Sequence, residues 1–227
     1  FLNGASHPEE LVVTAAALGL EAIAIADVNS VSGVVRAHTA AKQAGVQLVI
    51  GCRLQLSDGP DLLAYPKDRA AYGRLTRLLT LGKRRAPKGE CEISLADVLT
   101  RGDELVIALM APERIDPEFE NAMHELSLRF KKDLYLAVSY DYFGGNEARL
   151  KTQADLAIQA GVKMLACNDV RFHNAQRRPL QDVLTCIREG CSVHEAGWRL
   201  AANAERHLKA PTEMARLFAD YPNALTH

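Results

Sequence analysis

Short apolar runs alternate with amphipathic stretches along most of the chain. The runs lack the alternation of apolar and polar positions that marks a half-exposed strand, so they are typical of strands covered on both faces, as in a parallel sheet. Between them, apolar residues recur at helical spacing. Together the two patterns predict an α/β fold, either a barrel or an open doubly wound sheet. The six runs lie at residues 21–28, 46–56, 61–66, 104–112, 133–140 and 162–170.

Residues that are typical of helix ends flank several of the amphipathic stretches. Pro8 and two glutamates begin the first stretch, and Gly19 lies near its end. Ser94 is a candidate N-cap for a short helix further on. The predicted helices cover residues 7–20, 32–45, 67–81, 94–102, 117–130, 146–161 and 177–190.

Composition narrows the class of protein only slightly. The 227 residues are enough for one large domain or two small ones, and 48% of them are hydrophobic, as in a globular protein with a substantial core. The net charge of −1 argues neither for nor against a polyanionic partner. The five cysteines are odd in number and lack C-x-x-C spacing, so we expect a reducing, cytoplasmic compartment. No run approaches the roughly 20 apolar residues that span a bilayer. The chain begins at Phe1 without a methionine and ends just after a helical pattern, so we expect a fragment of a longer protein.

Charged residues lie at or near the carboxyl ends of three of the predicted strands, where α/β folds bind ligands. Asp27 and Asp169 would suit a metal, but Arg53 and Arg171 stand at the same level. A guanidinium has no lone pair to donate and repels a cation. We therefore expect the two arginines to pair with the two aspartates. A working metal cluster is the alternative.

A second charged cluster comes after the third predicted helix, in "LGKRRAPKGEC". Lys83, Arg84, Arg85 and Lys88 crowd around what reads as a loop. The loop could contact the phosphate backbone of DNA, or a neighbouring nucleic-acid-binding domain. Equally, it could be solvated or salt-bridged to an adjoining acidic surface. No aromatic residue is interleaved to stack on a base, so single-strand readout is unsupported.

Several stretches in order resemble the PHP (polymerase and histidinol phosphatase) domain of bacterial C-family DNA polymerases, the DNA polymerase III alpha-type subunits. The stretches include "AIADVNSVSGVVRAHTAAKQAG", "LVIGCRL" and "CNDVRFH". "LGKRRAPKGEC" and "RRPLQDVLTCIREG" are closest to the error-prone, damage-inducible group. The resemblance implies a distorted seven-stranded (β/α)7 barrel, TIM-like, over residues 1–215 with its first strand truncated. Residues 216–227 would begin the connection to a polymerase domain.

The resemblance also implies that this domain has lost its metal site. In members with a working site, histidines and carboxylates occupy the ligand positions, and a His-x-His strand would precede Phe1. His173 is out of register for the missing last histidine. We therefore expect no catalytic residue, metal or cofactor in this domain. The positions that match the family's ligands are Asn3, Asp27, Arg53, Asp61, Asp169 and Arg171.

By the same resemblance, the parent protein would be a Mg²⁺-dependent DNA polymerase of translesion synthesis and damage-induced mutagenesis. Its polymerase site would lie outside this chain. The expected partners are its own polymerase domain, DNA and other mutasome proteins, with no membrane. Two alternatives stay open: a metal-dependent phosphoesterase or exonuclease, and a DNA- or partner-binding module that uses the basic loop.

Overall fold

The computed structural model describes residues 2–226 and contains one six-stranded sheet. Its strands follow one another in the order of the chain, from β1 at one edge to β6 at the other. Each strand falls within one of the six predicted apolar runs, so the prediction of strands is confirmed. The strands are β1 (Ala22–Val28), β2 (Gln47–Leu54), β3 (Leu62–Pro66), β4 (Leu105–Met110), β5 (Leu134–Ser139) and β6 (Lys163–Cys167).

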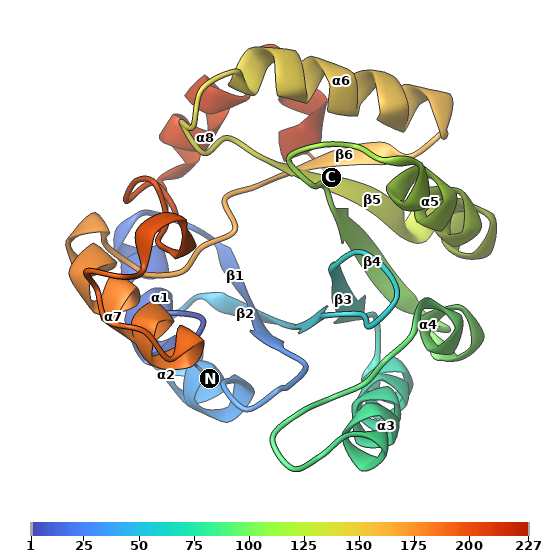
Figure 1. Ribbon diagram of the computed structural model, residues 1–227, viewed down its shortest axis with the longest axis horizontal. Helices are drawn as coiled ribbons and strands as arrows, with labels where there is room; N and C mark the ends of the chain where they lie inside the picture. Colours follow the sequence, from blue (N-terminus) through green and yellow to red (C-terminus); the bar gives the residue numbers. More distant parts are fainter. Residues whose placement is uncertain (1, 227) are drawn as a thin grey trace.

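Helices surround the curled sheet on its outside, as Figure 1 shows. The α-helices are α1 (Pro8–Ala17), α2 (Val34–Ala44), α3 (Arg69–Arg85), α4 (Leu95–Arg101), α5 (Pro117–Phe130), α6 (Asn146–Gln159), α7 (Arg178–Glu189) and α8 (Pro211–Leu217). Short 3-10 turns are η1 (Lys131–Asp133), η2 (Ala175–Arg177), η3 (Gly197–Arg199) and η4 (Pro222–Leu225). No helix within residues 2–226 is long and apolar enough to cross a bilayer.

The sheet is mixed, whereas the apolar runs predicted parallel strands. β3 pairs antiparallel with both β2 and β4, and the other neighbouring pairs are parallel. The cause is the short connection from β2 to β3, residues 55–61, because a parallel crossover needs about a dozen residues or more. Asp61, which precedes β3, consequently lies beside the carboxyl ends of β2 and β4: the next residue, Leu62, pairs with Leu54 and Leu109.

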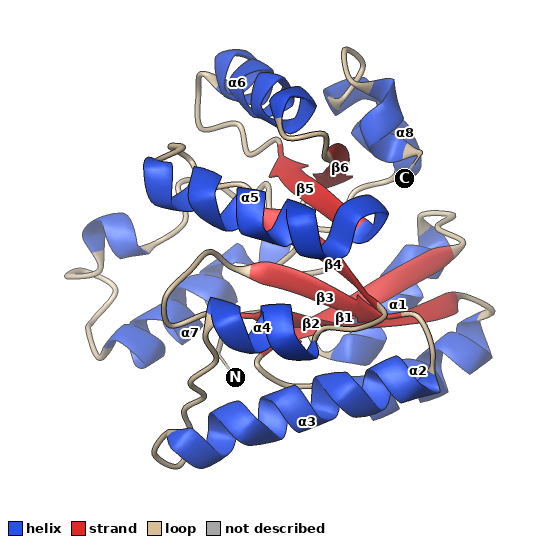
Figure 2. Ribbon diagram, turned by 90° about the vertical axis from the view of Figure 1, so that its right-hand side faces the viewer, coloured by secondary structure: helices blue, strands red, loops and turns tan. Residues whose placement is uncertain are grey.

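The sheet curls into a half-barrel, seen from the side in Figure 2. β1 and β6 form its two edges and do not pair with each other within residues 2–226. The expected seventh strand is not among the described residues. Beyond β6, the chain is held by a parallel bridge between Phe172 and His207 and by a 2.7 Å hydrogen bond from the Ala5 amide to the Arg171 carbonyl.

The main core fills the space between β2–β6 and the helices that follow those strands, and it includes residues of α8 and the position after it. Leu217 and Phe218 belong to it, with exposed fractions of 8% and 0%. Both residues follow the domain boundary expected at residue 215, which stays a prediction. A smaller core joins α1, α2 and β1, and its buried alanines, such as Ala15 and Ala37, suit a close approach of the two helices.

Helix α3 is longer than its sequence pattern predicted and includes part of the basic cluster. It begins after Asp68, whose side chain caps the Ala71 amide at 2.6 Å, and it ends at Arg85. Lys83, Arg84 and Arg85 form its last turn, so the interpretation of this stretch as a loop is wrong. Cations are favourable there because the carboxyl end of a helix carries partial negative charge.

Candidate functional site

Asp169 lies at the centre of an ion-pair cluster at the carboxyl ends of the strands. Arg53 donates from Nη1 to Asp169 Oδ1 at 2.8 Å and from Nε to Asp61 Oδ2 at 2.6 Å. Arg206 pairs with Asp169 Oδ2 and also donates from Nε to the Asp169 carbonyl oxygen at 3.0 Å. We call Arg53, Asp61, Asp169, Arg171 and Arg206 the arginine–aspartate cluster.

Arg171 joins this cluster to the start of the chain. Its Nη2 atom lies 4.0 Å from Asp169 Oδ2, and its Nη1 donates to the Asn3 carbonyl oxygen at 3.1 Å and to Asn3 Oδ1 at 3.3 Å. Arg188 also donates to Asn3 Oδ1, at 2.8 Å. The resemblance predicted Asn3 at a ligand position; in the structure its side-chain oxygen accepts hydrogen bonds from two guanidiniums.

The local backbone brings Asp169 into this position. Its φ angle is +39°, in the left-handed region that few residues other than glycine adopt. Such a conformation persists only where the surrounding contacts hold it. Here Arg53 contacts the Oδ1 atom of Asp169 and Arg206 contacts the Oδ2 atom.

Asp27 is engaged differently from the prediction. Its Oδ2 accepts hydrogen bonds from the Gly33 amide at 2.7 Å and from Ser32 Oγ at 3.4 Å. These contacts close the turn between β1 and α2. No ion pair joins Asp27 to an arginine within the described part of the chain, so the expected pairing holds for Asp169 alone. A side chain at position 33 would crowd the turn, because a Cβ there would lie 2.8 Å from Asp27 Oδ2.

The cluster is positively charged at neutral pH. Burial and repulsion from Arg53 and Arg188 lower the pKa of Arg171 to about 10. Burial and repulsion from Arg53 lower the pKa of Arg206 to about 10 as well. Both guanidiniums stay protonated near pH 7, so three cations face the carboxylates of Asp61 and Asp169.

This donor set does not fit a metal ion. The two carboxylates of the cluster already accept charged hydrogen bonds, and the arginines would repel a cation. Within residues 2–226, no group of three or more histidine, cysteine, aspartate or glutamate side chains is placed to hold one. His173, which is out of register by sequence, bonds instead through Nδ1 to Ser6 Oγ at 2.7 Å.

The two cysteines at the strand ends are neutral thiols. Burial raises the pKa of Cys52 to about 12. Burial also raises the pKa of Cys167 to about 11, although Arg53 and Arg206 oppose the shift. A thiol that stays protonated is a poor nucleophile and a poor metal ligand. Neither cysteine is therefore suited to attack a substrate or to bind a metal at this site.

A small cavity adjoins the cluster. Its volume of about 130 Å³ is below the 300–1,000 Å³ or so that small-molecule sites usually occupy. It is too small for a nucleotide. The residues that line it are Ser139, Tyr140, Asp141, Asn168, Asp169, Glu205 and Arg206.

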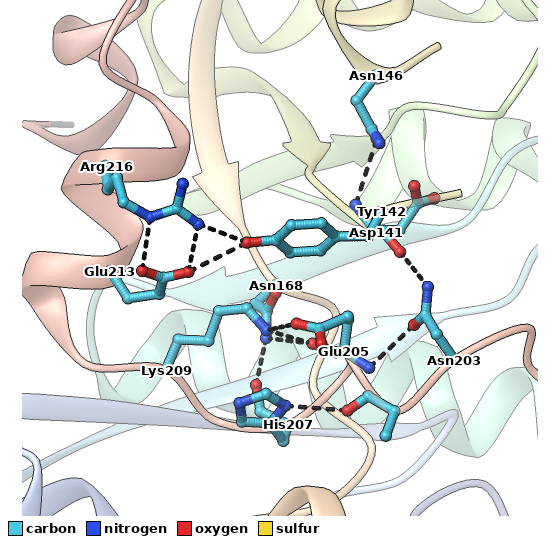
Figure 3. Close-up of polar contacts among 11 residues, drawn as sticks. Asp141, Tyr142, Asn146, Asn168, Asn203, Glu205, His207, Lys209, Glu213 and Arg216 are labelled. Atoms are coloured by element: carbon cyan, nitrogen blue, oxygen red, sulfur yellow. Dashed lines mark hydrogen bonds and ion pairs between the residues drawn. The ribbon is translucent and has the colours of Figure 1, made fainter. Parts of the chain in front are cut away.

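A polar network ties residues 203–216 to the loop after β5 and to Asn168, which follows β6 (Figure 3). Asn203 Nδ2 donates to the Asp141 carbonyl at 2.6 Å, and the buried Lys209 donates to the Glu205 carbonyl at 2.6 Å. Asn168 also donates to the carbonyl oxygens of Glu205 and His207 on either side of Arg206. The segment that carries Arg206 is therefore fixed from both flanks.

Helix α8 is fastened to the same loop by a second group of contacts in Figure 3. Tyr142 donates its hydroxyl proton to Glu213 Oε1 at 3.1 Å and accepts from Arg216 Nη2 at 2.6 Å. The hydrogen bond from Arg216 is the main cause that lowers the pKa of Glu213 to about 2. Glu213 therefore stays ionised and the contact persists well below neutral pH.

The basic cluster lies away from this site, at the end of α3. Arg85 pairs with both carboxylate oxygens of Asp97, at 2.5 and 3.1 Å. Lys83, Arg84 and Lys88 are exposed and form no ion pair within residues 2–226. Of the four predicted contact residues, Arg85 is thus neutralised by Asp97, and the other three remain available to bind a phosphate or a carboxylate.

The fold and the site define a class: a curled α/β sheet with its charged residues at the carboxyl ends of the strands. The chain belongs to the PHP domain family, whose sequence profile matches residues 1–135. Across 99% of its length it is 49% identical to the error-prone DNA polymerases of Caulobacter vibrioides and of Brucella abortus biovar 1. These relatives confirm the resemblance to the error-prone group. The chain spans 21% of the length of each.

A solved structure supports the fold independently. A protein from Bifidobacterium adolescentis, described as a metal-dependent phosphoesterase, superposes with a TM-score of 0.54. The match covers 74% of this chain and 83% of that one, at 14% identity. At that identity the likeness concerns the fold alone.

Proposed function

We propose that this chain is the PHP domain of an error-prone DNA polymerase that acts in translesion synthesis and damage-induced mutagenesis in the cytoplasm. The domain is structural and catalytically silent. Nucleotide transfer with Mg²⁺ belongs to polypeptide outside residues 1–227, and the partners are the protein's own polymerase domain, DNA and other mutasome proteins. The similarity to named error-prone polymerases over 99% of the chain supports the parent activity.

The proposal of a silent domain rests on one observation: arginines neutralise two of the three carboxylates at the expected ligand positions, Asp61 and Asp169. Arg53 alone joins Asp61 and Asp169, and Arg206 holds the second oxygen of Asp169. Freeing these oxygens for a metal would leave half-buried guanidiniums without partners, which costs on the order of a few kcal/mol. The donor set therefore favours a structural role over the alternative of a metal-dependent phosphoesterase or exonuclease.

In this proposal the half-barrel is part of a (β/α)7 barrel. β1 and β6 are the free edges, so a seventh strand from outside residues 1–227 would pair with one edge or close the gap between them. An edge strand left unpaired exposes backbone donors and acceptors, which proteins usually cover. The barrel then continues through residues 216–227 into the polymerase body.

The test compares the full-length protein with the 227-residue chain. We expect the full-length protein to extend a primed template with Mg²⁺. We expect the chain alone to release no product from a labelled oligonucleotide in Mn²⁺ or Zn²⁺. Hydrolysis by the chain that disappears in both Asp27→Asn and Asp61→Asn variants would overturn the silent assignment, whatever the full-length protein does.

A second role, contact with DNA phosphates, is favoured by the exposed end of α3. Charge reversal by Lys83→Glu with Arg84→Glu is expected to weaken DNA binding by the full-length protein and to flatten its salt dependence. Fluorescence anisotropy at several salt concentrations measures both. Lys151→Glu with Lys163→Glu, two exposed lysines of α6 and β6, changes the net charge by the same amount and is the matched control. Equal salt slopes for all variants would make the end of α3 a solvated surface.

A further inference from the structure

Helix α7 exposes three apolar side chains and buries two polar ones. Leu180, Val183 and Ile187 recur at helical spacing and are 40%, 45% and 61% exposed. Gln181 and Thr185 face the body of the domain, with exposed fractions of 6% each. A helix on the surface of a globular protein normally shows the opposite arrangement. Packing within this domain therefore does not explain the apolar stripe.

The segment after α7 returns along the helix and adds a tryptophan. The Cys191 amide bonds to the Cys186 carbonyl at 3.0 Å at one end of α7, and Arg178 donates to the Ala201 carbonyl at the other. Trp198, three positions before Ala201, is 98% exposed. We call Leu180, Val183, Ile187 and Trp198 the α7 surface.

An aromatic side chain this exposed indicates a surface that is covered in the working protein. Tryptophan and arginine are the residues most enriched where interfaces gain their binding energy. Arg199 is exposed beside Trp198 and has no ion pair within residues 2–226. The α7 surface thus suits an apolar partner surface that also carries a carboxylate or carbonyl acceptor.

The size of the α7 surface favours a tethered partner over a free one. Stable complexes of separate proteins bury about 1,200–2,000 Å² in total, more than three aliphatic side chains and one indole provide. Contacts between domains of one chain can be smaller, because the tether supplies a high effective concentration. The relatives extend well beyond this region, since the chain matches only 21% of their length.

We propose that the α7 surface is the docking face for another domain of the same polypeptide, outside residues 1–227. This inference rests on the proposed function, because it requires the chain to be one domain of a longer polymerase. It names the face by which a structural PHP domain would support the rest of the enzyme.

The test places the photo-crosslinking residue benzoylphenylalanine at position 187, and in a second variant at position 198, of the full-length protein. Val35 on α2, which is 75% exposed and outside the α7 surface, is the matched control position. Retained primer extension by each variant shows that it has folded. We expect positions 187 and 198 to crosslink to peptides outside residues 1–227, several-fold above position 35 and independently of protein concentration.

Three results would overturn the inference: yields no higher than at position 35, crosslinks confined to residues 1–227, or a doubled mass whose yield falls on dilution. The last would assign the face to a second copy. If the full-length protein extends primers but the expected crosslinks do not form, the docking face is refuted and the proposed function is not. If the unmodified protein extends no primer, the proposed function fails independently of the crosslinks.

Discussion

Replacing Asp169 with alanine is expected to lower the free energy of unfolding by about 3 kcal/mol, because removal of one partner strands buried charge. Arg53 and Arg206 would each lose their contact with this carboxylate, and Arg171 would lose its nearest anion in the cluster. The value lies at the low end for buried pairs because the Asp169 side chain is 23% exposed. Urea denaturation followed by circular dichroism measures it.

Two further variants separate charge from packing. Asp27→Ala removes a carboxylate that accepts a hydrogen bond within a turn and pairs with no arginine among the described residues. We expect the free energy of unfolding to fall by about 1 kcal/mol, as for an ordinary hydrogen bond. Asp169→Asn keeps the volume of the side chain and removes its charge, so it should cost most of what Asp169→Ala costs. If Asp169→Ala costs no more than Asp27→Ala, the cluster does not stabilise the domain.

Replacing Phe218 with alanine is expected to cost about 4 kcal/mol, the usual effect of truncating a fully buried aromatic side chain. Phe218 is 0% exposed and belongs to the main core, although it follows the predicted domain boundary. Thermal unfolding of the 227-residue chain measures the loss. Trp198→Ala is the matched control: it truncates an aromatic side chain that is 98% exposed, so its effect should be close to zero. Equal effects of the two variants would place Phe218 outside the cooperative unit.

The sequence predicted the strands well but not the direction of one of them. An apolar run records that a strand is covered on both faces, and this property does not depend on direction. The direction of β3 is set by the length of the connection before it, residues 55–61, and that length was available in the sequence. Helix α3 extended beyond its apolar pattern because cations are stable in a last turn.

The site was predictable only where its residues adjoin strands. Arg53 lies in β2 and Asp169 comes shortly after β6, so their pairing followed from the pattern. Arg206 was missed, because its place beside Asp169 depends on the bridge between Phe172 and His207, which no periodicity encodes. Asp27 was misassigned, because the turn formed with the Gly33 amide competes for the same oxygen.

The central claim, that arginines have replaced the metal, is tested most directly by metal content. The purified chain is incubated with Zn²⁺ and Mn²⁺, dialysed, and analysed by plasma mass spectrometry. The cluster of Arg53, Arg171 and Arg206 around Asp169 predicts near-zero metal per chain. Two or more tightly held ions per chain would contradict the account and restore a metal-dependent hydrolase as the function to be tested.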